Sequence, residues 1–391
     1  MGVAYISYNV YPGWKAKEIV RDAMLMRSGG RETPEERVAY ARGMITFLED
    51  VAPADSVLAR VLADYKVIAA SSKDYYLLHE ELETFNSPCY FLEMLERASE
   101  HRLAYLAEAL TSIMFPMNYG DKVAEPLLKE CGHSQVLMEQ YLDFVVNRPF
   151  RQTLLVHAER AQQIRYQLDR SGYERLQFGA WQPAVGGETR LDDSKQEYGD
   201  PAAATVVTQN PAVKAALDAL TARWPSTQSR QELLNEVQTQ LRAAGADATN
   251  VEGSIDDLLD FLIVRGRARY RLDPVMVEPV STPLRLDEPI RQMAQLTRAD
   301  ADASTFNVWH ETVALSPVDS HVLPLLDGTR DRDALEDALL ALTREGQISF
   351  ERDGQPVSGE SELREAVVAF IDALPQRLTG MKLVSARQAG L

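Results

Sequence analysis

Apolar and polar positions follow two different periods within the first 160 residues. Residues 3–8 and 151–157 are rich in β-branched and aromatic side chains, which predicts a strand at each end of this stretch. Residues 103–110 fit a strand or a helix equally well. Helical spacing predicts helices over 15–27, 34–50, 54–84 (with a break near Ser71), 89–101 and 134–146. The pattern therefore indicates a mainly helical segment framed by strands.

Local signals mark where several helices begin. Thr33 is followed by Pro34 and two glutamates, which is typical of a capped helix start. Ser229 and Glu232 have the spacing of a capping box, and Ser254 is also followed by acids. We expect helices over 229–244 and 254–264 and a strand over 267–272, an order that suggests a winged-helix-like module.

The rest of the pattern gives the domain organisation. Residues 180–210 hold Gly, Pro, Asp and Thr but few large apolar side chains, which favours a linker. Beyond residue 286 we expect helices over 318–326, 331–345 and 361–373, a short strand over 347–352, and a loosely held tail after Pro375. The predicted domains are a partial core with a helical insertion (1–165), a linker region (166–214), a winged-helix-like middle module (215–285) and a C-terminal helical module (286–391).

Composition excludes several classes of protein. The 391 residues include 41 Lys and Arg against 58 Asp and Glu, a net charge of −17, so we expect no nucleic-acid partner. The 45% apolar content excludes disorder of the whole chain. No apolar run approaches the roughly 18 residues of a membrane span, and no signal peptide is recognisable. Two cysteines exclude a disulfide scaffold and fit a reducing cytoplasm, where we expect the protein.

Several strings resemble known proteins. GVAYISYN (residues 2–9) resembles the fifth strand of class I S-adenosylmethionine (SAM)-dependent methyltransferases. SYNVYPGW (residues 7–14) is more specific. It resembles bacterial methyltransferases that carry a methyltransferase regulatory domain, to which protein-lysine methyltransferases of outer-membrane proteins are similar.

Five later strings agree with this resemblance and occur in the same order. They are YYLLHEELETFNSPCYFLEMLE (75–96), HRLAYLAEA (101–109), NRPFRQTLLVH (147–157) and the pair FNVWHETVALSP and LLDGTRDR within 306–332. The second and third resemble the sixth and seventh strands. The resemblance implies an α+β, mainly helical fold: the C-terminal half of a class I methyltransferase sheet with a helical insertion, followed by winged-helix-like modules.

One part of the family pattern has no counterpart in this sequence. In class I methyltransferases a glycine-rich turn after the first strand holds SAM, and an acid ending the second strand binds its ribose. Gly29-Gly30 and Gly186-Gly187 are the glycine pairs here, and neither follows a predicted strand into a helix. We therefore expect SAM to serve the intact enzyme and to have no site in this chain alone, which makes enzymatic activity of the isolated chain an open question.

The loop after the first strand is the candidate substrate pocket. The carboxyl ends of strands in open α/β sheets bind ligands, and an aromatic, hydrogen-bonding wall suits a neutral, desolvated lysine nucleophile. The alternative is a tight turn whose aromatic side chains pack on the next helix. The candidate residues are Ser7, Tyr8, Asn9, Tyr11 and Trp14.

Four alternating arginines form a second candidate site. On a strand, Arg265, Arg267, Arg269 and Arg271 would all point to one side and contact a partner. The acids of the preceding helix, among them Asp256, favour the alternative of an intramolecular salt-bridged face.

Other histidines and cysteines lack the partner residues that a metal or catalytic site needs. His79 and Glu83 share a helix face at spacing i, i+4, but no third metal ligand is evident. His310-Glu311 lacks the second histidine of a zinc-protease helix. Cys89 and Cys131 have no recognisable catalytic partner. We expect no metal.

Two functions remain. The chain is the regulatory and substrate-recognition portion of a methyltransferase acting on protein lysines, or it is a non-catalytic winged-helix scaffold that binds a partner protein. Under the first, the partners are a protein substrate and a separate chain that supplies the SAM-binding half. Exposed apolar sheet edges also predict self-association as a homodimer.

Overall fold

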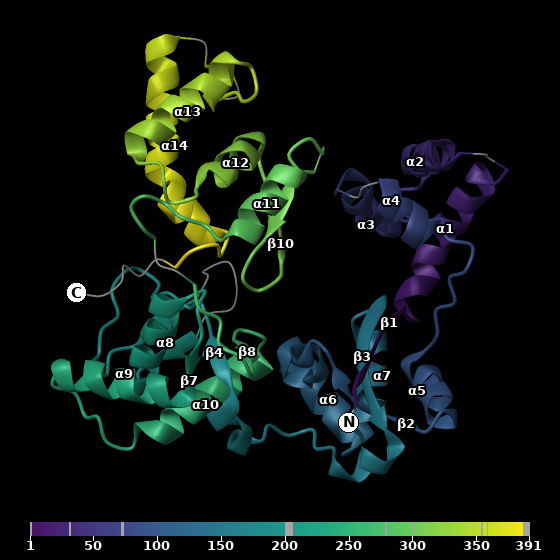
Figure 1. Ribbon diagram of the computed structural model, residues 1–391. Coiled ribbons are helices and arrows are strands. Elements are labelled where there is room, and N and C mark those ends of the chain that lie inside the picture. The colour runs from purple at the N-terminus through teal and green to yellow at the C-terminus, as the bar shows by residue number, and fades with distance from the viewer. Residues whose placement is uncertain are drawn as a thin grey trace. The chain divides into compact units, whose positions relative to one another are not determined.

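The computed structural model divides into two compact units, Met1–Leu168 and Asp169–Leu391, each described by itself (Figure 1). It describes residues 2–30, 33–71, 74–199, 206–277, 280–300, 302–352, 355–357 and 359–385. No helix in these ranges is both long and apolar enough to cross a bilayer.

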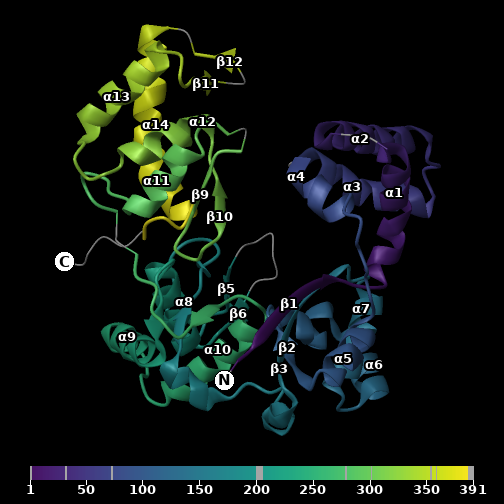
Figure 2. The ribbon, with the colours of Figure 1, turned by 45° about the vertical axis from the view of Figure 1, so that its right-hand side comes forward.

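The first unit contains a three-stranded sheet. Its strands are β1 (Ala4–Asn9), β2 (Leu103–Glu108) and β3 (Phe150–His157), in the order β1-β3-β2 (Figure 2). The outer strands both run antiparallel to β3, with Tyr8 opposite Arg151, so β1 and β2 are parallel to each other. The ambiguous segment 103–110 is thus a strand. The edge of β1 away from β3 has no partner strand among the described residues.

Helices fill most of the segment between β1 and β2. They are α1 (Gly13–Ser28), α2 (Pro34–Val51), α3 (Val57–Ser71), α4 (Asp74–Tyr76), the π-helical turn η1 (Leu77–Glu81) and α5 (Phe91–Glu100). The predicted cap of α2 is confirmed, because the Glu36 amide donates to Thr33 Oγ1 at 3.2 Å. Helices α1–α3 pack around a core that includes Met24, Ile45 and Tyr65. Figure 1 shows α1–α4 as a bundle beside the sheet.

A second helical segment connects β2 to β3, and a further helical turn follows β3. The connecting segment contains η2 (Thr111–Met114), η3 (Pro116–Tyr119), α6 (Asp121–Cys131) and α7 (Gln135–Val145). The turn after β3 is η4 (Ala158–Gln163). Helix α6 was not expected, because Pro126 lies inside it and proline disfavours a helix interior. Leu127 and Cys131 nevertheless bury their side chains against Leu142 of α7.

The prediction of a linker over 166–214 is wrong. This segment contains η5 (Arg170–Arg175), β4 (Gln177–Gly179), β5 (Gln196–Tyr198) and β6 (Val206–Thr208). Phe178 and Tyr198 are fully buried in the core of the second unit. Single aromatic residues set among Gly, Pro and Asp produce no periodic pattern, so nothing in the sequence indicated that they reach a core.

The middle module has the predicted helix, helix, strand order, preceded by a further helix and completed by two short strands. Its elements are α8 (Pro211–Arg223), β7 (Gln228–Ser229), α9 (Arg230–Ala243), α10 (Val251–Val264) and β8 (Arg269–Arg271). Strand β4, from upstream, lies between β7 and β8 and completes the sheet. The Ser229 capping box is confirmed. Ser254 caps nothing: α10 begins three residues earlier, and Ser254 Oγ accepts from Asn210 Nδ2 at 3.0 Å.

The C-terminal module surrounds a second core. Its elements are α11 (Glu288–Leu296), β9 (Ser304–Phe306), β10 (Thr312–Ala314), α12 (Pro317–Val322), η6 (Leu323–Leu325), α13 (Arg332–Arg344), β11 (Glu351–Arg352), β12 (Gln355–Pro356) and α14 (Glu360–Gly380). The prediction of a loosely held tail after Pro375 is wrong for the residues up to Ser385, the last described residue. Helix α14 continues through Pro375, since Leu374 and Leu378 extend its apolar stripe and both are buried.

Candidate functional site

Two segments far apart in the sequence meet at the carboxyl end of β1. Val10 forms a parallel bridge with Cys89, and the Tyr11 amide donates to the Cys89 carbonyl at 3.2 Å. The Asn9 Nδ2 donates to Asn86 Oδ1 at 2.9 Å. The strings SYNVYPGW and NSPCYF therefore lie side by side. Asn86 and Tyr90 entered the sequence analysis only as part of a resemblance, and no pattern indicated that they lie next to Asn9 and Tyr11.

The five predicted pocket residues do not share one surface. Ser7 is exposed, while Tyr8 points to the opposite face of β1 and its hydroxyl bonds Thr153 Oγ1 at 3.2 Å. Burial raises the pKa of Tyr8. Trp14 is 4% exposed and packs as a core residue. Of the five, Asn9 and Tyr11 are the two that meet the second segment.

Tyr11 and Tyr90 form an aromatic pair around a lysine. Their ring centroids are 5.5 Å apart, and the Lys15 Nζ lies 5.1 Å from the Tyr11 centroid and 5.3 Å from that of Tyr90. The ring of Phe144, which is 55% exposed, extends this surface at 5.7 Å from Tyr90. A cation over the faces of two rings is a favourable electrostatic arrangement.

Two carboxylates border this aromatic pair. The Tyr11 hydroxyl donates a hydrogen bond to Glu18 Oε1 at 2.8 Å, and the Tyr90 amide donates one to Glu93 Oε2 at 2.9 Å. Burial, with help from the Glu18 hydrogen bond, raises the pKa of Tyr11 to about 12. The hydrogen bond with Tyr90 raises the pKa of Lys15. At neutral pH the site thus holds a neutral phenol and a charged ammonium.

A buried cluster of charges supports the sheet beneath this site. Arg151 donates to Glu108 Oε1 at 2.6 Å, to Glu139 Oε2 at 3.0 Å and to Asp143 Oδ1 at 2.9 Å, and all four residues are at most 1% exposed. Its other N–H groups donate to Asp143 Oδ2 and to the Glu139 carbonyl, so all five donors are used. The cluster ties β3 to β2 and α7.

The direction of each hydrogen bond in this cluster follows from the donors. Glu108 accepts from Arg151, from the Gln152 amide and from the Thr153 hydroxyl. Thr153 Oγ1 in turn accepts from Tyr8. Burial raises the pKa of Glu139 and of Asp143. Burial alone would lower the pKa of Arg151, but its three carboxylates raise it.

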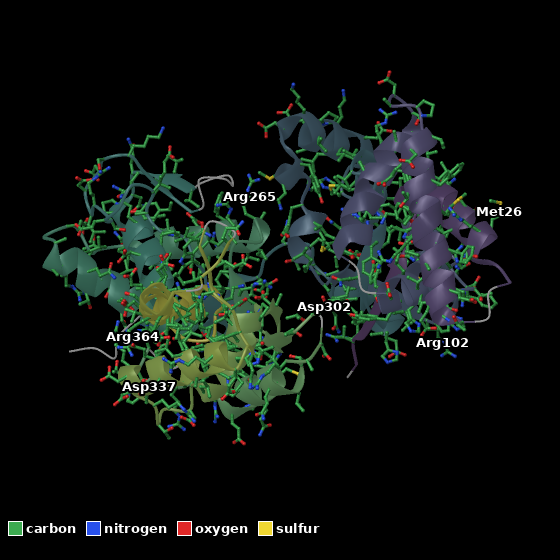
Figure 3. All side chains as sticks on the ribbon, turned by 90° about the horizontal axis from the view of Figure 1, so that it is seen from above. Met26, Arg102, Arg265, Asp302, Asp337 and Arg364 are labelled. Carbon is green, nitrogen blue, oxygen red and sulfur yellow. The ribbon has the colours of Figure 1, made fainter. Side chains whose placement is uncertain are left out.

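The prediction that Arg265, Arg267, Arg269 and Arg271 form a stripe on one side of a strand (the arginine stripe) is wrong. Arg265 ends α10, and Gly266 turns the chain at φ 66°, so β8 holds only Arg269 and Arg271 of the four. Figure 3 labels Arg265 at the surface. Arg269 pairs with Glu311 at 2.5 Å, and Arg267 donates to Gln182 at 3.4 Å. These contacts are intramolecular, as the alternative interpretation expects. The acids of α10 are paired as well, Asp256 with Arg230 and Asp260 with Arg170.

The other candidates do not form metal or nucleophile sites. His79 lies in the π-helical turn η1, which ends before Glu83, so the i, i+4 relation does not hold. His310 itself has a φ of 56° and is not on a helix. Within the described ranges, no three His, Cys, Asp or Glu side chains are placed to hold a metal. Both cysteines are buried, and burial raises the pKa of Cys89 and of Cys131, which keeps them as thiols.

The second unit contains a cavity of about 630 Å³. Trp224 stacks on Trp309 at 5.7 Å, and Lys382 Nζ lies 5.6 Å from the Trp224 ring. The lining residues are Trp181, Trp224, Val280, Pro375, Gln376, Thr379, Gly380 and Lys382. A volume of this size with mainly apolar walls is typical of a binding pocket.

Two domain families match parts of this chain. Residues 73–157 match the family described as predicted methyltransferase regulatory domain. Residues 287–383 match the family described as PKMT, C-terminal winged helix domain. Both families are named for methyltransferases. The predicted resemblance is thereby confirmed for these two segments, and residues 287–383 are similar to the C-terminal winged-helix domain of PKMT (protein lysine methyltransferase) proteins.

Relatives and solved structures extend the similarity along the chain. Uncharacterized protein RP789 of Rickettsia prowazekii (strain Madrid E) is 25% identical over 393 residues, covering 98% of this chain and 69% of its own length. PKMT2 from Rickettsia typhi, solved in complex with AdoHcy, has a TM-score of 0.79 at 21% identity, covering 99% of this chain and 75% of PKMT2. A second structure of that protein gives 0.75. At this identity the likeness shows the fold. That this chain has no SAM site of its own stays a prediction.

Proposed function

We propose that this chain is the regulatory and substrate-recognition portion of a SAM-dependent methyltransferase that acts on protein lysines. The observation that carries the proposal is the meeting of segments 9–14 and 86–90 at the carboxyl end of β1. That end of an open sheet is where ligands bind, and both segments lie in strings that resemble the methyltransferase family. The similarity to PKMT2 and the two matched domain families support the same activity.

The proposal places the SAM site outside this chain. SAM supplies a methyl group on a sulfonium, and the family's site uses a glycine-rich turn and a free acid at a strand end. Strand β2 does end in an acid, Glu108, but this carboxylate is fully buried and bonded to Arg151. The turn that follows β1 contains Gly13 as its one glycine, and a Cβ there would meet the Arg148 backbone at 2.5 Å. Gly13 thus serves close packing, and we propose that SAM is bound by groups outside this chain.

The open edge of β1 is the proposed place of contact with the SAM-binding half, supplied by a separate chain. Val3 and Tyr5 are more than half exposed along this edge, and an unpaired strand accepts another strand readily. Homodimerisation is proposed through the helical bundle instead, where Ile19, Met26 and Phe47 are exposed. Met26 projects from the surface in Figure 3. Free buried cysteines are consistent with the cytoplasm as the compartment.

The chemistry of this chain's own residues is positioning and desolvation. Methyl transfer to an amine needs no covalent enzyme intermediate, so holding the lysine in line contributes most of the rate. Asn9 and Asn86 offer amide groups, and Tyr11 and Tyr90 offer aromatic walls, at one end of the sheet. The winged-helix modules would hold the rest of a macromolecular substrate.

The first experiment is isothermal titration of SAM and of AdoHcy into the chain. The proposal expects no heat up to about millimolar ligand, which corresponds to a free energy weaker than about −4 kcal/mol. Micromolar binding would overturn the claim that SAM is bound elsewhere. A second arm mixes the chain with a separately produced SAM-binding domain and measures transfer of a radiolabelled methyl group to a lysine-containing protein. Absence of transfer in the mixture contradicts the substrate-recognition role.

A non-catalytic scaffold is the alternative function. The cavity bounded by Trp181 and Trp224 favours it, because aromatic-lined pockets are common at protein-binding surfaces. Under this alternative the mixture described above would transfer no methyl group. Substitution of Trp181 by Ala would then weaken binding of the partner protein, and methyl transfer would be absent with or without this substitution.

A further inference from the structure

We propose that Tyr11 and Tyr90, with Glu18 and Glu93, form a receptor for the ammonium group of a substrate lysine, and that Lys15 occupies this receptor in the free chain. We call these four residues the ammonium receptor. The inference rests on the proposed function for the source of the ligand, a protein lysine. The binding chemistry itself rests on the geometry of the rings and of the carboxylates hydrogen-bonded beside them.

The rings provide the first part of the argument. The Lys15 Nζ lies within 5.3 Å of both centroids, inside the roughly 6 Å reach of a cation–π interaction. The two planes are inclined at 57°, so the rings form a corner that receives a cation from the open side. Tyr90 also contacts the exposed ring of Phe144, which continues the apolar wall for the methylene chain of an incoming lysine.

The carboxylates provide the second part. Glu18 and Glu93 both act on the charge of Lys15. Each is held by a neutral donor, Glu18 by the Tyr11 hydroxyl and Glu93 by the Tyr90 amide. Two carboxylates therefore lie beside the pair of rings that holds one ammonium. A receptor with this balance favours cations, and it retains a methylated ammonium, which keeps its charge.

Lys15 is built to be displaced. Its side chain is exposed, and it lies in the first turn of α1, at the rim of the receptor. Among the described residues, no carboxylate lies within 4 Å of the Lys15 ammonium. The two rings and the hydrogen bond with Tyr90 therefore hold this side chain. Lys17, two residues on, differs: its Nζ lies over Trp14 and Tyr65, whose rings are buried in the core. Lys17 therefore makes a matched control.

The location connects the receptor to the proposed reaction. Tyr11 and Tyr90 follow Asn9 and Asn86 on the two paired segments, directly after the carboxyl end of β1. A charged lysine seated between the rings would lie at the same end of the sheet, and it must lose its proton before its nitrogen can accept a methyl group. Lys15 then acts as an internal competitor for the substrate side chain.

The test is isothermal titration of the full chain with three short peptides that differ at one lysine: unmodified, trimethylated and acetylated. The Lys15→Ala variant should bind the two cationic peptides about fivefold more tightly than the unchanged protein does, since the competitor is gone. The Lys17→Ala variant should match the unchanged protein. The neutral acetylated peptide should bind none of them.

Ring variants in the Lys15→Ala background complete the experiment. Tyr90→Leu should remove the gain, and Tyr90→Phe, which keeps the ring, should retain it. Circular dichroism and thermal melting establish that each variant is folded. Equal binding of the acetylated peptide, or no gain on removing Lys15, would overturn the proposal. Since this titration needs no SAM, cation binding that follows the predicted order without any methyl transfer would defeat the proposed function and leave the receptor intact.

Discussion

Arg151 is the residue on which the sheet of the first unit depends most. It contacts three buried carboxylates and packs its guanidinium 3.8 Å from the Phe91 ring centroid. Lysine could not replace it, because an ammonium has three donors and no planar fork. Removal of one partner from a buried ion cluster leaves the remaining charges uncompensated, which costs far more than the cluster contributes when intact.

Replacement of Arg151 by Met should therefore destabilise the protein by about 3–5 kcal/mol. Urea unfolding followed by circular dichroism measures this change. Arg102 is exposed at the surface (Figure 3) and serves as the control, since Arg102→Met should change stability by less than about 0.5 kcal/mol. Similar losses at the two positions would mean that the cluster is not a structural centre.

Glu81 gives a pH-dependent prediction. It is 1% exposed, accepts from the Tyr65 hydroxyl at 2.8 Å, and burial raises its pKa above the ordinary value of 4.5. The folded state thus binds its proton more tightly than the unfolded state does. The favourable contribution of the neutral form is complete below the unfolded pKa and is lost as pH rises through the folded pKa.

Glu81→Gln, which stays neutral and can still accept from Tyr65, should therefore be more stable than the unchanged protein at pH 8. The difference should shrink steadily as the pH falls toward 4.5. Thermal melting across this range at constant ionic strength provides the measurement. A variant that is less stable at pH 8 would show that the carboxylate, paired with nearby cations, is favourable when charged.

At the scale of helices and strands, local signals were predictable from the sequence and long-range placements were not. Caps at Thr33 and Ser229 depend on neighbours three residues away, so a single sequence reveals them. The pairing of Asn9 with Asn86 joins residues 77 positions apart, and no periodicity encodes it. The arginine stripe failed for a related reason: alternation suggested one strand, but Gly266 ends a helix within it.

Loss of the Ser229 cap should cost about 1 kcal/mol in Ser229→Ala, whereas Ser229→Thr should retain most of it, because the hydroxyl that accepts from the Glu232 amide remains. Chemical denaturation of both variants compares them directly. If the alanine variant were as stable as the threonine variant, water would be satisfying the first turn of α9 as well as the side chain does.

Helix α14 allows a test of its unexpected final turns. Leu378, three residues after Pro375, is 1% exposed, so Leu378→Ala should destabilise the second unit by about 2–5 kcal/mol. Arg364 on the same helix forms a surface ion pair with Glu336 at 3.3 Å, and Arg364→Ala should cost less than about 1 kcal/mol. A negligible effect at Leu378 would restore the prediction of a loosely held tail.

At the scale of the whole molecule, the chain consists of two compact units with separate cores. Residues between η4 and η5 have no regular structure and are mostly exposed, and Arg165 lies among them. Exposed irregular segments are the preferred sites of proteolysis.

Brief digestion with trypsin should therefore cut after Arg165 or Arg170 and leave two resistant fragments. Mass spectrometry of the products locates the cut. Separate melting of the isolated fragments would show that each unit folds on its own. Initial cleavage within α8 or β3 would contradict the division into these units.

Strand β4 sets an order of events during synthesis. It occupies the centre of the sheet in the middle module, yet it is made before every other element of that module. Its neighbour β8 follows about 90 residues later. At ordinary translation speeds β4 waits on the order of 5–20 seconds for β8, and until β7 is made, roughly the first half of that interval, both of its edges are open. The ribosome thus exposes the aromatic Phe178 well before its core exists, and this interval is when a chaperone would have most to protect.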